Sequence, residues 1–160
     1  VTGVQTCALP IFGIDGGEPI AITRQSGYHL SKRAYSSSSY DISPDGLEVA
    51  FVADVDRSGV DPNSDVIVLE ACGCKPARDV TVSNLADDGS PAYSPDGRWL
   101  AYTAQTIKGF YADRGRLLLL DRKNGGVSDL SVDWDRTPND LQWQSDSKSL
   151  YSAEIGRAHV

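Results

Sequence analysis

Short apolar segments alternate with turn residues along this chain of 160 residues, and one arrangement of them occurs three times. Each copy is a lead-in strand, a turn and a second strand, and the copies span residues 41–51, 92–102 and 142–152. The turn aspartates Asp45, Asp96 and Asp146 are therefore spaced by about 50 residues. A period of that length built from short strands is typical of the four-stranded blades of a β-propeller.

The repeat predicts two complete blades, at residues 36–83 and 88–132. Continuous apolar runs at Val66–Leu69 and Arg116–Asp121 predict the third strand of each blade, buried on both faces between neighbouring blades. We expect Val80–Val82 to close the first of these blades.

Partial blades flank the complete ones. Residues 12–35 fit the end of a truncated blade, in which Asp15-Gly16-Gly17 supplies a hairpin turn. Residues 138–154 fit the start of another. The predicted fold class is therefore all-β, an incomplete β-propeller with two full four-stranded antiparallel blades and two partial blades. Helical periodicity is limited to a possible turn near residues 112–114.

Three large side chains share one position of the repeat, three residues before the turn aspartate. They are Ile42, Tyr93 and Trp143. Because they occupy the same position in the repeat, we expect their side chains to fill equivalent slots between blades. The third turn, Gln144–Ser147, lacks both the proline and the glycine of the other copies, so we expect it to be the least regular of the three.

Both ends of the chain look foreign. Residues 1–11 and residues 155–160 can each be back-translated into a DNA sequence. The DNA sequence for residues 155–160 is the reverse complement of a stretch within the sequence for residues 1–11, and this DNA resembles a sequencing adapter. We therefore expect these two segments to be unrelated to the fold. The remaining segment begins and ends inside the repeat, which predicts an internal piece of a larger protein.

Bulk properties exclude some classes. The formal charge of −7 argues against electrostatic binding of nucleic acid, which needs a basic face. No apolar run reaches about 18 residues, so no membrane-spanning helix is expected. A closed propeller needs about 4–8 blades, more than this chain supplies. The compartment, cytoplasmic or periplasmic, stays open.

The sequence offers no complete catalytic constellation. It has no G-x-S-x-G elbow, and the nearest string, Gly126–Leu130, lacks the closing glycine. Outside the foreign ends His29 is the one histidine, and a loop histidine of this kind is usually a surface residue. We therefore predict no catalytic residues, no cofactor-binding residues, no metal ligands and no cofactor.

One acidic loop deserves comparison with a calcium site. Asp54, Asp56, Ser58 and Gly59, followed by Asp65, match the spacing of a calcium-binding loop. Strands rather than helices are expected on both sides, and Pro62 interrupts the pattern. We interpret the segment as a solvated acidic loop, with calcium binding as the alternative.

Two further features are open to functional interpretation. Cys72 and Cys74 flank Gly73; a disulfide closed over one residue is strained and two thiols alone make an incomplete metal site, so we expect a pair of loop thiols. Phe110–Arg114 lies in the long loop of the second full blade. Arg114 is expected to pair with Asp113 or Asp121, or else to face a substrate cavity.

Several sequence segments resemble those of a known protein family. The Ser-Pro-Asp-Gly turns, each followed by a strand such as Leu100-Ala101-Tyr102, resemble the repeats of TolB-type propellers. The strings that narrow the match are Ser94–Tyr102, Gly109–Arg114, Asp121-Arg122 and Asp133–Arg136. Together they resemble the N-terminal propeller of dipeptidyl aminopeptidases and acylaminoacyl peptidases in the prolyl oligopeptidase family.

The resemblance implies a function for the parent protein. In that family the propeller covers a C-terminal α/β-hydrolase domain that carries a Ser-Asp-His triad, and it restricts entry to short peptides. None of the triad residues maps onto this chain. The implied partners are that hydrolase domain and short peptide substrates, with no nucleic acid and no membrane span. The alternative is a TolB-like propeller that serves as a periplasmic protein-binding scaffold without enzymatic activity.

Overall fold

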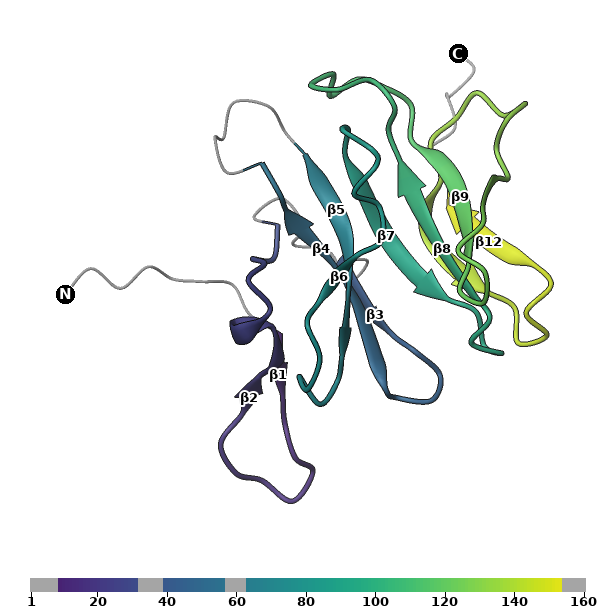
Figure 1. Cartoon of the computed structure of the whole chain (residues 1–160). Helices are drawn as coiled ribbons and strands as arrows, with labels where there is room; N and C mark the ends of the chain where they lie inside the picture. The colour runs from purple at the N-terminus through teal and green to yellow at the C-terminus, as the bar shows by residue number, and fades with distance from the viewer. Residues whose placement is uncertain (1–8, 32–38, 57–62, 154–160) are drawn as a thin grey trace, which may run out of the picture.

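The computed structural model describes residues 9–31, 39–56 and 63–153, and the regular secondary structure of these residues is almost entirely β-strand (Figure 1). The strands are β1 (Pro10–Ile11), β2 (Ile20–Ala21), β3 (Tyr40–Ile42), β4 (Glu48–Asp54), β5 (Ser64–Glu70), β6 (Arg78–Asp79), β7 (Asp88–Tyr93), β8 (Trp99–Ala104), β9 (Arg116–Asp121), β10 (Val127–Asp129), β11 (Asn139–Trp143) and β12 (Leu150–Ala153). A short 3-10 helix, η1 (Ile22–Gln25), follows β2 and was not expected from the sequence.

The strands form four antiparallel sheets in chain order. Two sheets have four strands, β3-β4-β5-β6 and β7-β8-β9-β10, and the flanking sheets β1-β2 and β11-β12 have two. Each strand pairs with its neighbour in sequence, which is the meander of a propeller blade. The predicted fold class, two full blades with two partial ones, is confirmed.

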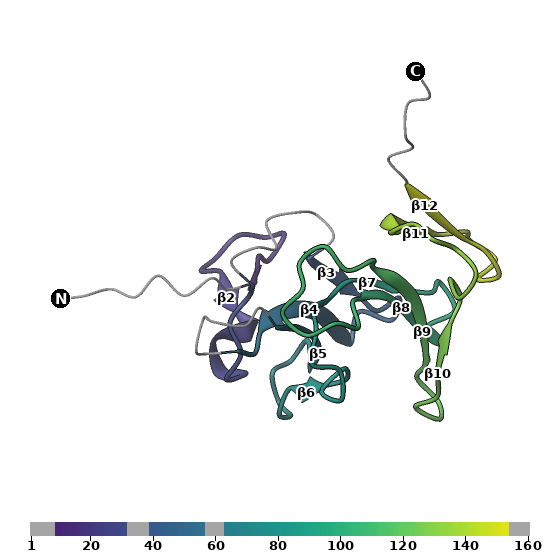
Figure 2. The same cartoon turned by 90° about the horizontal axis from the view of Figure 1, so that it is seen from above.

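The sheets are arranged as an open fan (Figure 2). The first strand of each later sheet contacts the preceding sheet: β7 packs on β3, β4 and β5, and β11 packs on β7 and β8. Within the described ranges no helix is long and apolar enough to cross a membrane.

Alternation along β4 divides the core into two clusters, one on each face of the first full blade. Ala50, Val66 and Val68 face the next blade, where they meet Tyr93, Leu100, Tyr102 and Ala104. Phe51, Ala53, Ile67 and Leu69 face the N-terminal segment, where Leu9, Ile22, Tyr28 and Leu30 pack against them. The period of two in β4 and β5 therefore produces a blade that is apolar on both sides.

The third strands of the two full blades differ in burial. Strand β5 is buried along almost its whole length, as predicted. Strand β9 was expected to be equally buried, but Arg116–Leu120 are only half-buried. The reason is coverage: β5 faces a four-stranded blade, whereas the described residues beyond β9 provide only the two-stranded sheet β11-β12.

The prediction of equivalent interblade slots is correct for only part of the set. Tyr93 is buried between the full blades, and Trp143 is half-buried against β7, where its Nε1 donates to the carbonyl of Ala92 at 3.0 Å. Ile42, in contrast, is 52% exposed. Its face points toward the N-terminal segment, where Leu9, Ile22, Tyr28 and Leu30 pack on the cluster of Phe51 and Ile67, to which Ile42 does not belong.

The outer edge of the first full blade also differs from expectation. The outer strand of the first full blade is Arg78–Asp79 rather than Val80–Val82, although the Val80 N–H still donates to the Val66 carbonyl. In the segment expected to be foreign, Pro10 and Ile11 pair with β2, and the Leu9 N–H donates to Thr23 Oγ1 at 3.1 Å. Residues 1–8 and 154–160 lie outside the described ranges.

Candidate functional site

The repeated turn is built around a serine and an aspartate. In the first copy the Ser43 hydroxyl donates to Asp45 Oδ1 at 2.6 Å and accepts the Glu48 N–H at 2.9 Å. The Leu47 N–H donates to the same carboxylate oxygen at 3.0 Å, and Gly46 takes φ +71°. The Ser43 and Leu47 hydrogen bonds hold the pKa of Asp45 below its ordinary value.

The second copy repeats these bonds and the third keeps only some of them. Ser94 donates to Asp96 at 2.5 Å and accepts the Trp99 N–H at 2.9 Å. In the third copy Gln144 replaces the serine, so the hydroxyl bridge is missing, but Ser147 adopts φ +60° and its N–H donates to the Gln144 carbonyl at 3.0 Å. The third turn is therefore formed but less tightly bonded, in line with its sequence.

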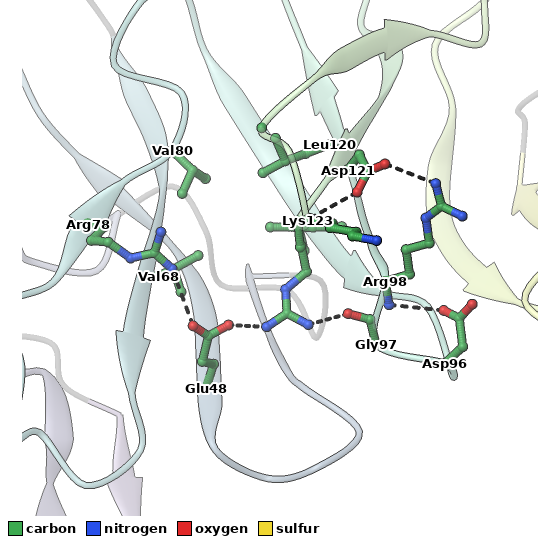
Figure 3. Close-up of a pocket in the computed structure, with 13 residues that line it drawn as sticks. Glu48, Val68, Arg78, Val80, Asp96, Gly97, Arg98, Leu120, Asp121 and Lys123 are labelled. Atoms are coloured by element: carbon green, nitrogen blue, oxygen red, sulfur yellow. Dashed lines mark hydrogen bonds and ion pairs between the residues drawn. The ribbon is translucent and has the colours of Figure 1, made fainter.

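The second turn borders a groove between the two full blades, with a volume of about 630 Å³ (Figure 3). Its floor is apolar, contributed by Val68, Val80, Leu100 and Leu120. Its rim carries charged side chains of both signs: Glu48, Arg78, Asp96, Arg98, Asp121, Arg122 and Lys123.

Glu48 is the centre of the rim (Figure 3). Arg78 of the same blade donates Nη2 to Glu48 Oε1 at 3.2 Å, and Arg122 of the next blade donates Nη2 to Glu48 Oε2. Arg122 also donates Nη1 to the Gly97 carbonyl, and its guanidinium lies 4.8 Å from the centre of the Tyr93 ring. The Arg122 side chain thus contacts β4, the second turn and β7.

The other side of the rim is held by Asp121. Its carboxylate accepts the Lys123 N–H at 2.9 Å and Arg98 Nη2 at 3.1 Å, and these contacts lower its pKa from the ordinary value. Arg98 lies over the Trp99 ring at 4.4 Å. The groove lining contains no serine, cysteine or histidine, so it offers no nucleophile–base pair. Chemically it is a charge-compensated groove suited to holding blades together or to binding a polar chain.

The positions of Asp54 and Asp65 do not fit a shared calcium ion. Asp54 pairs with Ser64 in the β4-β5 ladder and Asp65 pairs with Ala53, so Asp54 and Asp65 point to opposite faces of the sheet. Ser64 Oγ lies 3.3 Å from Asp54 Oδ1, in agreement with that register. Residues 57–62, including Ser58 and Gly59, lie outside the described ranges.

Two carboxyl groups near this loop are buried: the sequence singled out Asp65 only as a candidate calcium ligand, and it did not indicate Asp88. Asp65 and Asp88 are only 2% and 3% exposed, and each has one carboxylate oxygen without a hydrogen-bond partner among the described residues. Burial raises the pKa of Asp88 to about 7, with Asn84 acting in the opposite direction. Burial and the neighbouring Asp79 raise the pKa of Asp65. Strand periodicity alone could have marked Asp65, because it shares a face with Ile67.

The loop from Gln105 to Arg116 has a different anchor from the one expected. Arg116, not Arg114, forms the ion pair with Asp113, at 3.3 Å, and Arg114 donates to the Ser131 carbonyl at 3.1 Å. The Thr106 and Ile107 N–H groups donate to Asp113 at 2.6 and 3.0 Å. Phe110 and Tyr111 remain exposed at the tip. Arg114 therefore fixes the loop by a route that the sequence did not indicate.

The remaining sequence candidates are far from any catalytic arrangement. His29 is exposed, and its backbone carbonyl accepts the Asp54 N–H at 3.2 Å. Gly126–Leu130 forms the end of a hairpin and strand β10, with Ser128 exposed.

The expectation of two loop thiols at Cys72 and Cys74 is wrong in this structure, because the two cysteines form a disulfide. Gly73 at φ +63° allows the turn that brings their Cα atoms to 5.3 Å. Glu70 lies beside them, and the three side chains are grouped closely enough to hold a metal ion. While the sulfurs are joined to each other, they are not available as thiolate ligands.

Comparison with known proteins gives a consistent picture. No family model matches the chain. Over 127 residues, 72% of the chain, it is 28% identical to dipeptidyl-peptidase 5 of Arthroderma otae and 29% identical to that of Trichophyton equinum, and it spans 17% of the length of each.

A solved structure agrees with the predicted architecture. TolB from Acinetobacter baumannii matches 99% of this chain and 35% of its own length, with a TM-score of 0.68 at 16% identity. Pyrococcus horikoshii acylaminoacyl peptidase matches 71% of this chain and 16% of its own length, with a TM-score of 0.49 at 16% identity. The resemblance drawn from the turn motifs is therefore confirmed: the chain is a β-propeller segment related to dipeptidyl-peptidases, consistent with the propeller domain of a prolyl oligopeptidase-family peptidase.

Proposed function

We propose that these blades are part of a propeller that controls the access of short peptides to the catalytic domain of a serine exopeptidase. The observation that carries the proposal is the 28% identity to dipeptidyl-peptidase 5 over 127 residues, which is 72% of this chain. The chain corresponds to 17% of that relative, so the catalytic groups belong to other parts of the parent protein. The C-terminal α/β-hydrolase domain is the proposed partner.

The blade contacts support a filtering role. A propeller selects by size only when its blades keep their spacing, because a passage that widens freely admits larger chains. Here Asp41 Oδ2 accepts the Tyr93 N–H at 2.7 Å and Trp143 Nε1 donates to the Ala92 carbonyl. Both bonds join the first strands of successive sheets, β3 to β7 and β7 to β11, and so fix the relative position of the blades.

The test uses the full-length parent protein. Dipeptidyl substrates with a chromogenic leaving group should be hydrolysed, and the kcat/KM for peptides of increasing length should fall steeply. Asp41→Ala removes the β3–β7 bond and should flatten that decline, with little change for the shortest substrate. Asp133→Asn, on an exposed loop, is the matched control and should leave the length dependence intact. Equal length dependence in Asp41→Ala and in the parent would contradict gating by these blades.

A second function is supported by the TolB match, which extends over 99% of the chain. A TolB-like propeller would serve as a protein-binding scaffold without enzymatic activity. The two functions are distinguished by the parent sequence and its activity: a G-x-S-x-G elbow in a following α/β domain, together with peptide hydrolysis, favours the peptidase. A parent protein without either favours the scaffold.

A further inference from the structure

We propose that the Cys72-Gly73-Cys74 turn is a thiol–disulfide exchange site that reacts with low-molecular-weight thiols of the glutathione class. The site lies in the turn after β5, on the outer part of the first full blade, and it is separate from the groove. It does not depend on the peptidase proposal.

Access and ring size favour reaction over stabilisation. Cys72, Gly73 and Cys74 are all exposed, so an external thiol reaches either sulfur without unfolding. A disulfide that closes over a single residue removes little entropy from the unfolded chain, because that effect grows with the length of the closed loop. Exposed disulfides are the ones commonly found in labile or catalytic roles.

The surroundings distinguish the two sulfurs. The Cys74 N–H donates to Cys72 Sγ at 3.3 Å, which stabilises negative charge on Cys72 when the bond breaks. Glu70 Oε2 lies 3.6 Å from Cys72 Sγ and 3.5 Å from Cys74 Sγ. The Lys75 ammonium pairs with Glu70 Oε1 at 2.5 Å and offsets part of the carboxylate charge.

These contacts assign an order to the exchange. An external thiolate attacks Cys74 Sγ, the bond between the two sulfurs breaks, and the electron pair leaves on Cys72 Sγ, which then takes a proton from solvent. A second external thiolate attacks the external sulfur of the mixed disulfide on Cys74. The products are one molecule of oxidised external disulfide and the Cys72–Cys74 dithiol, so two thiols are oxidised as one protein disulfide is reduced.

The first test is an equilibrium with reduced and oxidised glutathione, followed by acid quenching and mass spectrometry, on the chain carrying Cys7→Ser. The intramolecular disulfide should form and disappear reversibly as the glutathione ratio changes, while the urea midpoint of unfolding stays the same in both forms. Cys72→Ser should trap a glutathione adduct on Cys74. A disulfide that resists reduction until the chain unfolds, or a pair that never closes, would overturn the proposal.

The second test measures the role of the neighbouring charges through the pH dependence of thiol oxidation by oxidised glutathione. Glu70→Gln removes a negative charge beside both sulfurs and should speed the reaction about two- to fivefold near neutral pH, because the thiolate fraction rises. Lys75→Gln should slow it by a similar factor. Gly73→Ala places a side chain at φ +63° and should disfavour ring closure. Identical rates in the two charge variants would show that Glu70 and Lys75 do not act on the sulfurs and would contradict the part of the proposal that depends on the neighbouring charges.

Discussion

Arg122, in the turn between β9 and β10, donates to the carboxylate of Glu48 on β4 of the preceding blade. The two residues are 74 positions apart, and both side chains are largely withdrawn from solvent, at 25% and 19% exposure. Because Arg122 also bonds the Gly97 carbonyl and covers the Tyr93 ring, it couples the blade interface to the repeated turn. This contact therefore links the two full blades at the rim of the groove.

Arg122→Ala should lower the free energy of unfolding of the chain by about 1–3 kcal/mol, since it removes charge-assisted hydrogen bonds and leaves Glu48 with Arg78 alone. The measurement is urea unfolding followed by tryptophan fluorescence. Arg98→Ala is the matched control in the same groove. Its ion pair is more exposed, at 54% for the arginine, and should cost less than about 1 kcal/mol. Equal losses in the two variants would contradict the role given to Arg122.

Tyr93→Phe should leave the stability unchanged or raise it by up to about 1 kcal/mol. The Tyr93 hydroxyl is buried without a hydrogen-bond partner among the described residues, so its removal ends a desolvation cost without breaking a bond. The ring, and with it the Arg122 contact, is retained. Denaturant unfolding of both forms checks this, and a loss above about 1 kcal/mol would show that the hydroxyl has a partner.

Asp113→Asn should weaken the chain mainly above pH 4. Partial burial raises the pKa of Asp113, but the Thr106 and Ile107 N–H groups and Arg116 outweigh it and hold the pKa at about 2. The carboxylate therefore stabilises the fold above the ordinary value near 4, and that contribution disappears as the pH falls toward 2. We expect a loss of about 1–2 kcal/mol at pH 7 and a smaller loss at pH 2.5. A difference between variant and parent that does not change with pH would contradict this.

Asp88→Asn should change the pH dependence in the opposite sense. Burial raises the pKa of Asp88 to about 7, so the folded chain holds a proton that the unfolded chain has released between about pH 4 and 7. Stability contributed by this group is present at low pH and is lost as the pH rises through that window. The substitution should improve stability at pH 8 relative to pH 5 by about 1–3 kcal/mol. Thermal unfolding at the two pH values measures it, with Asp133→Asn as the exposed control. An unchanged pH profile would contradict the assignment.

The sequence predicted the strands well because the turn chemistry is local. Ser43, Asp45 and Gly46 bond within their own turn, and the alternation of Val49 and Phe51 with Ala50 and Val52 sets which face each strand presents. The turns and apolar runs therefore identified the two full blades. The same alternation could have excluded a shared calcium ion for Asp54 and Asp65.

The candidate groove was not predictable in the same way. Glu48 and Arg122 come together only because the second full blade packs on the first through β7, and no local pattern shows that pairing. The half-burial of β9 depends on how many strands cover it, which its apolar sequence does not record. The Cys72–Cys74 bond depends on the left-handed conformation of Gly73, and the sequence favours that conformation without requiring it.

Peptide hydrolysis by the full-length parent protein, measured as a function of peptide length, tests the central claim most directly. The account predicts cleavage of dipeptidyl substrates, a steep decline in kcat/KM with length, and a weaker decline when Asp41→Ala removes the hydrogen bond between β3 and β7. A parent protein that hydrolyses none of these peptides, or that cleaves long and short ones equally well, would contradict it.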